Sequence, residues 1–299
     1  MLQVSWGALA ALGLLLVICF VLPLGLSGLL YRMAGCRFKP CGLGAAAYFF
    51  GGFVTEMLLM GIIRSFTDMT KNLPVYLLYS LVLSPAVFLA VNFVVMKWIA
   101  KGGLRHTGDA MMYAVGYSGL ENLFTTGFVA VMYMVTLWGI KQHAGSYVVV
   151  SESDYVSYSN LVSPSSLVTD RIYGEMQVLC SRPAGYFLAL CFDRVWAIVV
   201  YAAALLILWL AVTKKDRLPL LGMACGVRLL IGLPTVFSDL GVIRNAWVSA
   251  LLVVLLAAAA WAAAVFCWRR YIDSENADGM PADSNEPATV AEDDEEVEE

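Results

Sequence analysis

Hydrophobic positions in this chain come in long runs, and polar positions gather in the segments between them. Each run contains about twenty apolar residues, the length that a helix needs to span the roughly 30 Å hydrocarbon core of a bilayer. The pattern therefore predicts an all-α, polytopic membrane protein with about seven transmembrane helices. We place the spans at Ala8–Tyr31, Leu43–Ile63, Pro74–Ala100, Ala110–Ile140, Ala184–Val212, Leu218–Phe237 and Ala246–Trp268.

The composition agrees with this fold class. Of the 299 residues, 60% are hydrophobic and only 14% are charged, whereas soluble domains carry about 25% charged residues. Nothing resembles a nucleic-acid-binding surface, so we expect membrane lipid and no nucleic acid as a partner. The seven cysteines are odd in number and lie mostly inside apolar runs, which argues against a disulfide framework.

Lysine and arginine predict the orientation, because the cytoplasmic loops of membrane proteins carry an excess of these residues. Eleven of the nineteen Lys and Arg residues fall in one set of alternate connections, and six are spread over the much longer opposite set. This distribution predicts an N-terminus outside and a C-terminus inside. We expect the protein in the cell (inner, or plasma) membrane.

Two segments fall outside the predicted spans. Residues 141–183, on the predicted outer side, are rich in Ser, Tyr and Val, and we interpret them as a solvated connector or as a short hairpin or interfacial lid. Residues 273–299 end in an acidic run and cannot bury a core, so we expect a disordered acidic cytoplasmic tail. Residues 1–272 then form one seven-helix transmembrane domain.

The most informative stretch is 108–127, which opens a predicted span yet carries an acid, Glu121, about three helical turns in. Small residues in the run 116–119 precede this acid, and small residues let neighbouring helices approach closely. A charged group is costly in lipid, faces the bundle interior and marks a functional site by default. The other such polar residues are Glu56, Asn92, Asp193, Arg194 and Arg228. Of these, Glu56 lies near the outer half of its helix, which favours a structural role or snorkelling.

Helical spacing relates several of these residues to tyrosines. Tyr117 lies four residues before Glu121, and Tyr201 lies seven residues after Arg194, so each pair shares a helix face. We expect a cluster from three helices that contains these four residues and Arg228. A structural interpretation stays open, because Arg–carboxylate pairs between helices also fix packing and register.

Histidine is nearly absent from the sequence. His106 and His143 both lie in predicted connections, so the spans offer no set of three protein ligands for a catalytic zinc ion. No nucleotide-binding loop, nucleophile elbow or catalytic triad spacing is present either. We therefore expect no metal site and no cofactor.

Three short motifs follow one another along the predicted spans. The first is Asp109-Ala110 followed by Gly116-Tyr117-Ser118-Gly119-Leu120-Glu121, the second is Asp193-Arg194 followed by Tyr201, and the third runs from Arg228 to Pro234. In their order, their spacing and the seven-span plan, they resemble the YhfC-type family of multi-pass membrane proteins. These proteins are described as intramembrane peptidases distantly akin to the prenyl-protein (CAAX) proteases. The resemblance implies that Glu121, Asp193 and Arg194 carry over from the family pattern.

The chain departs from that family pattern at the histidines. Tyr117, Tyr201 and Arg228 stand where the family has histidine. Tyrosine, with an unperturbed pKa of about 10, does not replace histidine as a base or metal ligand at neutral pH, and arginine cannot act as a base. The family's acidic pair and its nearby arginine are replaced as well, by Phe88, Leu89 and Asn92. The resemblance then implies a peptidase fold in which an arginine fills the place of a metal ion or an imidazolium and neutralises Glu121.

The first functional hypothesis is a catalytically degenerate family member. Such a protein binds a transmembrane or lipidated peptide in the family's cleft without cleaving it. Its binding residues are expected to be Asp193, Arg194, Glu56 and Asn92.

Two further hypotheses stay open. In an active intramembrane protease, Glu121 activates a water molecule, Tyr117 and Tyr201 orient it, and Arg228 stabilises the oxyanion. In a small transporter, Glu121, Arg194 and Arg228 bind an anionic or zwitterionic solute at mid-membrane depth.

Overall fold

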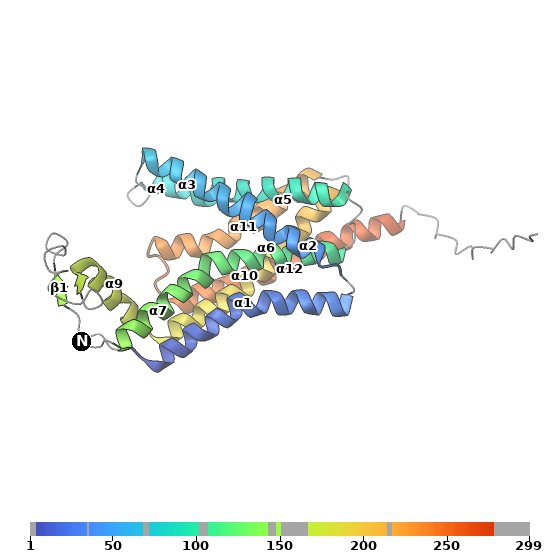
Figure 1. Cartoon of the computed structure of the whole chain (residues 1–299). Helices are drawn as coiled ribbons and strands as arrows, with labels where there is room; N and C mark the ends of the chain where they lie inside the picture. Colours follow the sequence, from blue (N-terminus) through green and yellow to red (C-terminus); the bar gives the residue numbers. More distant parts are fainter. Residues whose placement is uncertain are drawn as a thin grey trace, which may run out of the picture.

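Seven long helices form a bundle in the computed structural model (Figure 1). The structure describes residues 4–34, 36–67, 72–101, 107–142, 148–150, 167–213 and 217–277. Within these residues, seven helices are long and apolar enough to cross a membrane, so the prediction of a polytopic helical protein is confirmed. Every predicted span end lies within four residues of the corresponding end in the structure.

Three of the seven spans are built from more than one helical element. The single-element spans are α1 (Trp6–Ala34), α10 (Ala184–Thr213), α11 (Arg217–Asp239) and α12 (Ala246–Ala277). The composite spans are α2 (Lys39–Ala46), η1 (Ala47–Phe53) and α3 (Val54–Phe66); α4 (Leu73–Leu78), η2 (Tyr79–Leu83) and α5 (Ser84–Lys101); and α6 (Thr107–Asn122), η3 (Leu123–Gly127) and α7 (Phe128–Gln142). Each element named η is a short π-helical segment.

Helix α10 lies at the centre of the bundle, where it contacts α1, α5, α6, α11 and α12 (Figure 1). All of its residues from Val200 to Ala211 are buried. A helix that is apolar on every face is stable only when other helices surround it. The one hydroxyl in this stretch belongs to Tyr201, so the central helix carries a polar group into the interior.

Two glycines allow α2 and α6 to pack backbone against backbone. A Cβ atom at Gly44 would lie 2.1 Å from the carbonyl oxygen of Tyr113, and one at Gly116 would lie 2.0 Å from the carbonyl oxygen of Cys41. Any side chain at either position would therefore push the helices apart. This contact agrees with the small residues of the 116–119 run and fixes α6, which carries Glu121, against α2.

The three π-helical segments surround one region of the bundle. Segment η3 directly follows the turn of α6 that carries Glu121, η1 directly precedes α3, which carries Glu56, and η2 directly precedes Ser84. A π-helical turn inserts an extra residue into the helix, and such turns occur frequently at functional sites. Here they change the direction of the side chains on three spans at mid-depth.

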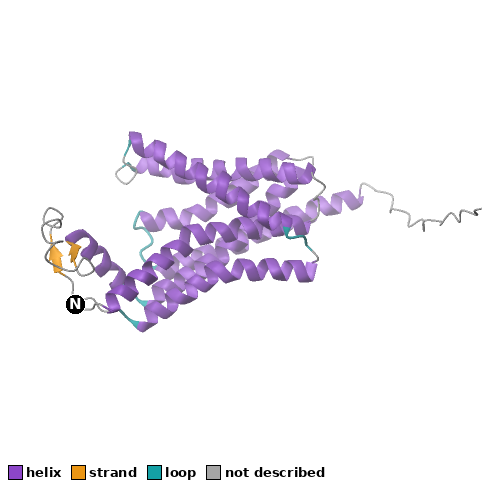
Figure 2. Cartoon of the chain, in the orientation of Figure 1, coloured by secondary structure: helices purple, strands orange, loops and turns teal. Residues whose placement is uncertain are grey.

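The predicted outer segment contains regular structure (Figure 2). Strands β1 (Val148–Val150) and β2 (Leu167–Thr169) pair in parallel, so they do not form the antiparallel hairpin considered from the sequence. Residues 151–166 lie outside the described part of the chain. Helix α9 (Asp170–Ser181) follows, contacts α7, and is capped by Thr169, whose hydroxyl accepts a hydrogen bond from the Ile172 amide at 3.4 Å.

The last helix is longer than its predicted span. Helix α12 extends to Ala277 and so includes the first residues of the segment that we assigned to the acidic tail. The rest of that tail, residues 278–299, lies outside the described residues.

Candidate functional site

An ion pair between helices lies at the middle of the bundle. Glu121 is in the last turn of α6, and Arg228 is halfway along α11. Their side chains are 13% and 12% exposed, and Nη2 of Arg228 lies 3.7 Å from Oε1 of Glu121. The Tyr201 hydroxyl on α10 donates a hydrogen bond to the same carboxylate oxygen. Side chains of α10 and α11 thus contact the carboxylate that α6 carries.

This carboxylate faces a cavity of about 390 Å³. Its polar lining comes from α3, α4, η2, α5, η3, α10 and α11 as well as α6, and the residues are Glu56, Tyr76, Tyr79, Ser80, Ser84, Glu121, Thr125, Thr126, Asp193, Arg194, Tyr201, Arg228 and Thr235. Glu56 accepts a hydrogen bond from the Ser84 hydroxyl at 2.7 Å. Its carboxylate therefore lies at the cavity wall. We call this space the Glu121 cavity.

A second cavity lies next to the Glu121 cavity, near one end of the bundle. It has a volume of about 580 Å³ and shares Asp193, Arg194 and Thr235 with the first. Arg182, Asp239 and Arg244 also line it, near the connection between α11 and α12. The two cavities therefore have part of their polar lining in common.

Asp193 and Arg194 stand at the junction of the two cavities. Nε of Arg194 donates to Oδ2 of Asp193 at 2.8 Å. The backbone carbonyl of Arg194 accepts a hydrogen bond from Nδ2 of Asn122 at 3.3 Å, which links α10 to α6. This pair is neutral as a unit and extends the polar lining of the Glu121 cavity towards the second cavity.

Two residues of the predicted site lie beside the cavity and not in its wall. Tyr117 is buried among aromatic rings, with its ring centroid 5.4 Å from those of Tyr48 and Phe88 and 6.3 Å from that of Tyr201. Asn92 is fully buried, donates to the carbonyl of Phe88 at 2.7 Å and accepts from the Tyr113 hydroxyl at 2.7 Å. The structure thus brings together Glu56, Glu121, Asp193, Arg194, Tyr201 and Arg228, and leaves Tyr117 and Asn92 in the packing behind them.

Several cavity residues were missed by sequence reasoning. The Ser84 hydroxyl donates a hydrogen bond to Glu56. The Tyr76 hydroxyl donates to Oδ2 of Asp239 at 2.6 Å. Thr125 and Thr126 reach the wall from η3. Ser, Thr and Tyr are common in transmembrane helices, so their presence alone gave no signal. Only Asn122, adjacent to Glu121, could have been found as a second polar group in the same stretch.

Three buried polar atoms of the site have no hydrogen-bond partner among the described residues. They are Oε2 of Glu121, Oδ1 of Asn122 and Nε of Arg228. Buried polar groups are almost always paired, so unpaired ones require an explanation such as a bound ligand. The guanidinium of Arg228 also lies 5.3 Å from the ring of Phe88 and 5.0 Å from that of Tyr201, contacts that stabilise a cation in an apolar place. The site therefore offers both acceptors and a donor to a polar group that enters it.

Seven apolar spans folded around a buried polar cavity define a multi-pass membrane protein with an intramembrane site. Comparison with protein-family models identifies the particular family: the model of the YhfC intramembrane metalloproteases matches residues 18–253, and the chain belongs to that family. The matched region contains every residue of the Glu121 cavity. Searches of curated proteins and of solved structures found no significant match.

The family description implies a metal ion, and the side chains around Glu121 do not fit one. Among the described residues, no group of three His, Cys, Asp or Glu side chains is placed to hold a metal ion. The carboxylate of Glu121 faces Arg228, and that of Asp193 is bonded to Arg194. A catalytic zinc site uses three nitrogen, sulfur or oxygen ligands, and a guanidinium has no lone pair to offer.

Proposed function

We propose that this protein is a catalytically degenerate member of its family that binds a transmembrane or lipidated peptide in the Glu121 cavity. The observation that carries this proposal is the ion pair in which Nη2 of Arg228 lies 3.7 Å from Oε1 of Glu121. In metallopeptidases the metal ion polarises the scissile carbonyl and activates a water molecule. An arginine beside the carboxylate supplies positive charge and hydrogen-bond donors, but it can neither coordinate a water molecule as a metal ion does nor accept a proton from it.

The unpaired polar atoms of the site support a peptide as the ligand. A peptide group presents one N–H donor and one C=O acceptor, and both must be satisfied inside a membrane. Oε2 of Glu121 can accept from the N–H, and Nε of Arg228 can donate to the C=O. A volume of about 390 Å³ suits a short extended segment, whereas a whole helix is about 10–12 Å wide. The ligand would therefore enter through an unwound stretch or a chain end.

We also propose that the protein resides in the plasma membrane with its N-terminus outside. The distribution of Lys and Arg, which favours one set of alternate connections, supports this orientation. In this orientation the second cavity, near the α11–α12 connection, faces the outside, and the peptide reaches Glu121 from that side.

The proposal is tested with two fluorescent probes in lipid nanodiscs: a synthetic single-span peptide and the same peptide with a farnesylated C-terminal cysteine. We expect wild-type protein to bind at least one probe and to leave it intact by mass spectrometry. Tyr201→Phe removes the hydrogen bond that orients the Glu121 carboxylate and should weaken binding by about tenfold, because that side chain must then be ordered when the peptide binds.

The matched control is Tyr79→Phe. Tyr79 lines the same cavity, but no hydrogen bond from its hydroxyl to Glu121 is present in the structure. Equal affinity for wild type and Tyr201→Phe would contradict binding at Glu121. Cleavage of either probe that Glu121→Gln abolishes would show that the protein is an active protease.

A further inference from the structure

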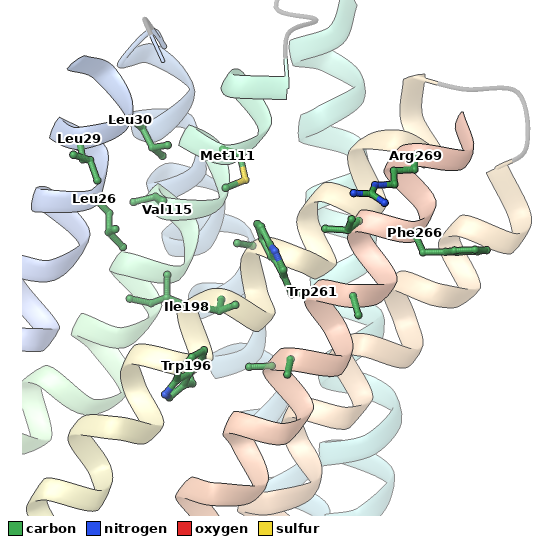
Figure 3. Close-up of a pocket in the computed structure, with 16 residues that line it drawn as sticks. Leu26, Leu29, Leu30, Met111, Val115, Trp196, Ile198, Trp261, Phe266 and Arg269 are labelled. Carbon is green, nitrogen blue, oxygen red and sulfur yellow. The ribbon is translucent and has the colours of Figure 1, made fainter. Parts of the chain in front are cut away.

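A large cavity lies away from the Glu121 cavity and is almost entirely apolar (Figure 3). It has a volume of about 860 Å³ and lies between α1, α6, α10 and α12. Its lining consists of Leu26, Leu29, Leu30, Met111, Val115, Trp196, Ile198, Val199, Ala202, Ala257, Ala258, Trp261, Ala262, Val265, Phe266 and Arg269. Arg269 is the only charged residue among them. We call this space the α1–α12 groove.

Short side chains create the groove. Helix α12 carries alanine at 257–260 and again at 262–264, and Ala257, Ala258 and Ala262 form part of the wall. Larger side chains in these places would fill the space. The groove is bounded by Trp261 on the α12 side and by leucines of α1 on the other side, as Figure 3 shows.

The groove has the length of one leaflet. From Ala257 to Arg269 the helix rises by about 18 Å, and half of the hydrocarbon core measures about 15 Å. Figure 3 places Trp196 at the deep end and Arg269 at the opposite end. Arg269 also lies next to the end of the membrane span, which closes at Arg270. An apolar chain in the groove would therefore bring its polar end to Arg269.

Basic side chains at that end of the bundle favour an anionic lipid headgroup. The spans of α1, α5 and α12 end there in Arg32, Lys101 and Arg270, and α2 begins there at Lys39 (Figure 1). These four side chains are exposed, as is that of Arg269. Arginine pairs with phosphate through two parallel hydrogen bonds, and a surface rich in Lys and Arg attracts anionic lipids.

We propose that the α1–α12 groove binds one anionic glycerophospholipid, with an acyl chain along the alanines of α12 and the phosphate at Arg269. The groove lies on the opposite side of α10 from Glu121: Trp196, Ile198, Val199 and Ala202 face the groove, whereas Ala197 and Tyr201 face the Glu121 cavity. This lipid site is independent of the proposed peptide site.

Native mass spectrometry of the protein released from nanodiscs with equal amounts of phosphatidylglycerol and phosphatidylcholine tests the proposal. We expect one phosphatidylglycerol to be retained per chain in preference to phosphatidylcholine. Arg269→Gln should lower this occupancy by about tenfold, because a charge-assisted hydrogen bond to phosphate is lost. Arg64→Gln makes the same change of charge at an exposed position on α3, outside the groove lining and apart from these basic side chains, and should leave the occupancy unchanged.

A second pair of variants tests the acyl-chain part. Ala258→Phe fills the groove and should displace the lipid, whereas Ala259→Phe, on an exposed position outside the lining, should not. Equal retention of both lipids, or an equal effect of the two members of either pair, would overturn the proposal. A dimer that Ala258→Phe dissociates would also overturn it, since the groove would then hold a second copy of the chain.

Discussion

The carboxylate of Glu121 accepts a hydrogen bond from Tyr201 and lies 3.7 Å from Arg228, so residues of three helices share one buried charge. These partners could be predicted from the sequence, because a charge inside a membrane needs a partner. The position of the Tyr117 side chain could not be predicted in the same way. Four residues turn a helix by about 400°, so the Tyr117 and Glu121 side chains diverge by about 40°. That offset directs Tyr117 towards the rings of Tyr48 and Phe88.

The ion pair predicts a coupling in stability. Arg228→Gln and Glu121→Gln each leave a buried charge unpaired, and each should lower the free energy of unfolding by about 3–5 kcal/mol. The double variant Glu121→Gln/Arg228→Gln should lose less than the sum, because no unpaired charge remains. Chemical unfolding in one detergent measures all three, with the exposed Arg244→Gln as control. Additive losses would show that the two side chains do not interact.

At the scale of elements, apolar run length predicted all seven spans but none of the breaks within them. The π-helical segments η1, η2 and η3 depend on how the helices pack against one another. No residue type or pattern in the sequence marks their positions. Helix α9 was missed because its polar side chains give no long apolar run, which is the signal that identified the spans. The connector between α7 and α10 therefore has more structure than its composition indicated.

The contact between α2 and α6 makes the sharpest prediction at this scale. Gly116→Ala places a methyl group against the carbonyl oxygen of Cys41, and the resulting overpacking should lower the free energy of unfolding by about 1–3 kcal/mol or more. Gly42→Ala on α2 adds the same methyl group where nothing lies within 4 Å. It should be neutral or stabilising by up to about 1 kcal/mol, because alanine favours helix. Equal unfolding free energies for the two variants would contradict the close helix contact.

The whole molecule is a seven-span bundle in which the central helix α10 separates a polar cavity from an apolar groove. The sequence predicted the bundle, because hydrophobic length decides membrane insertion. It could not predict the groove, because an alanine-rich face either packs closely or leaves a space, and only the neighbouring helices decide between them. The orientation across the membrane stays a prediction from the Lys and Arg residues.

We propose that Arg228 stands beside Glu121 where related peptidases hold a metal ion, and the metal content of the purified protein decides between the two. Inductively coupled plasma mass spectrometry should find no stoichiometric zinc or other transition metal in the wild-type protein after exposure to zinc and gel filtration. Glu121→Gln serves as the matched sample, since it removes the only carboxylate at the Arg228 pair. A stoichiometric metal ion in the wild type that disappears in Glu121→Gln would contradict the claim.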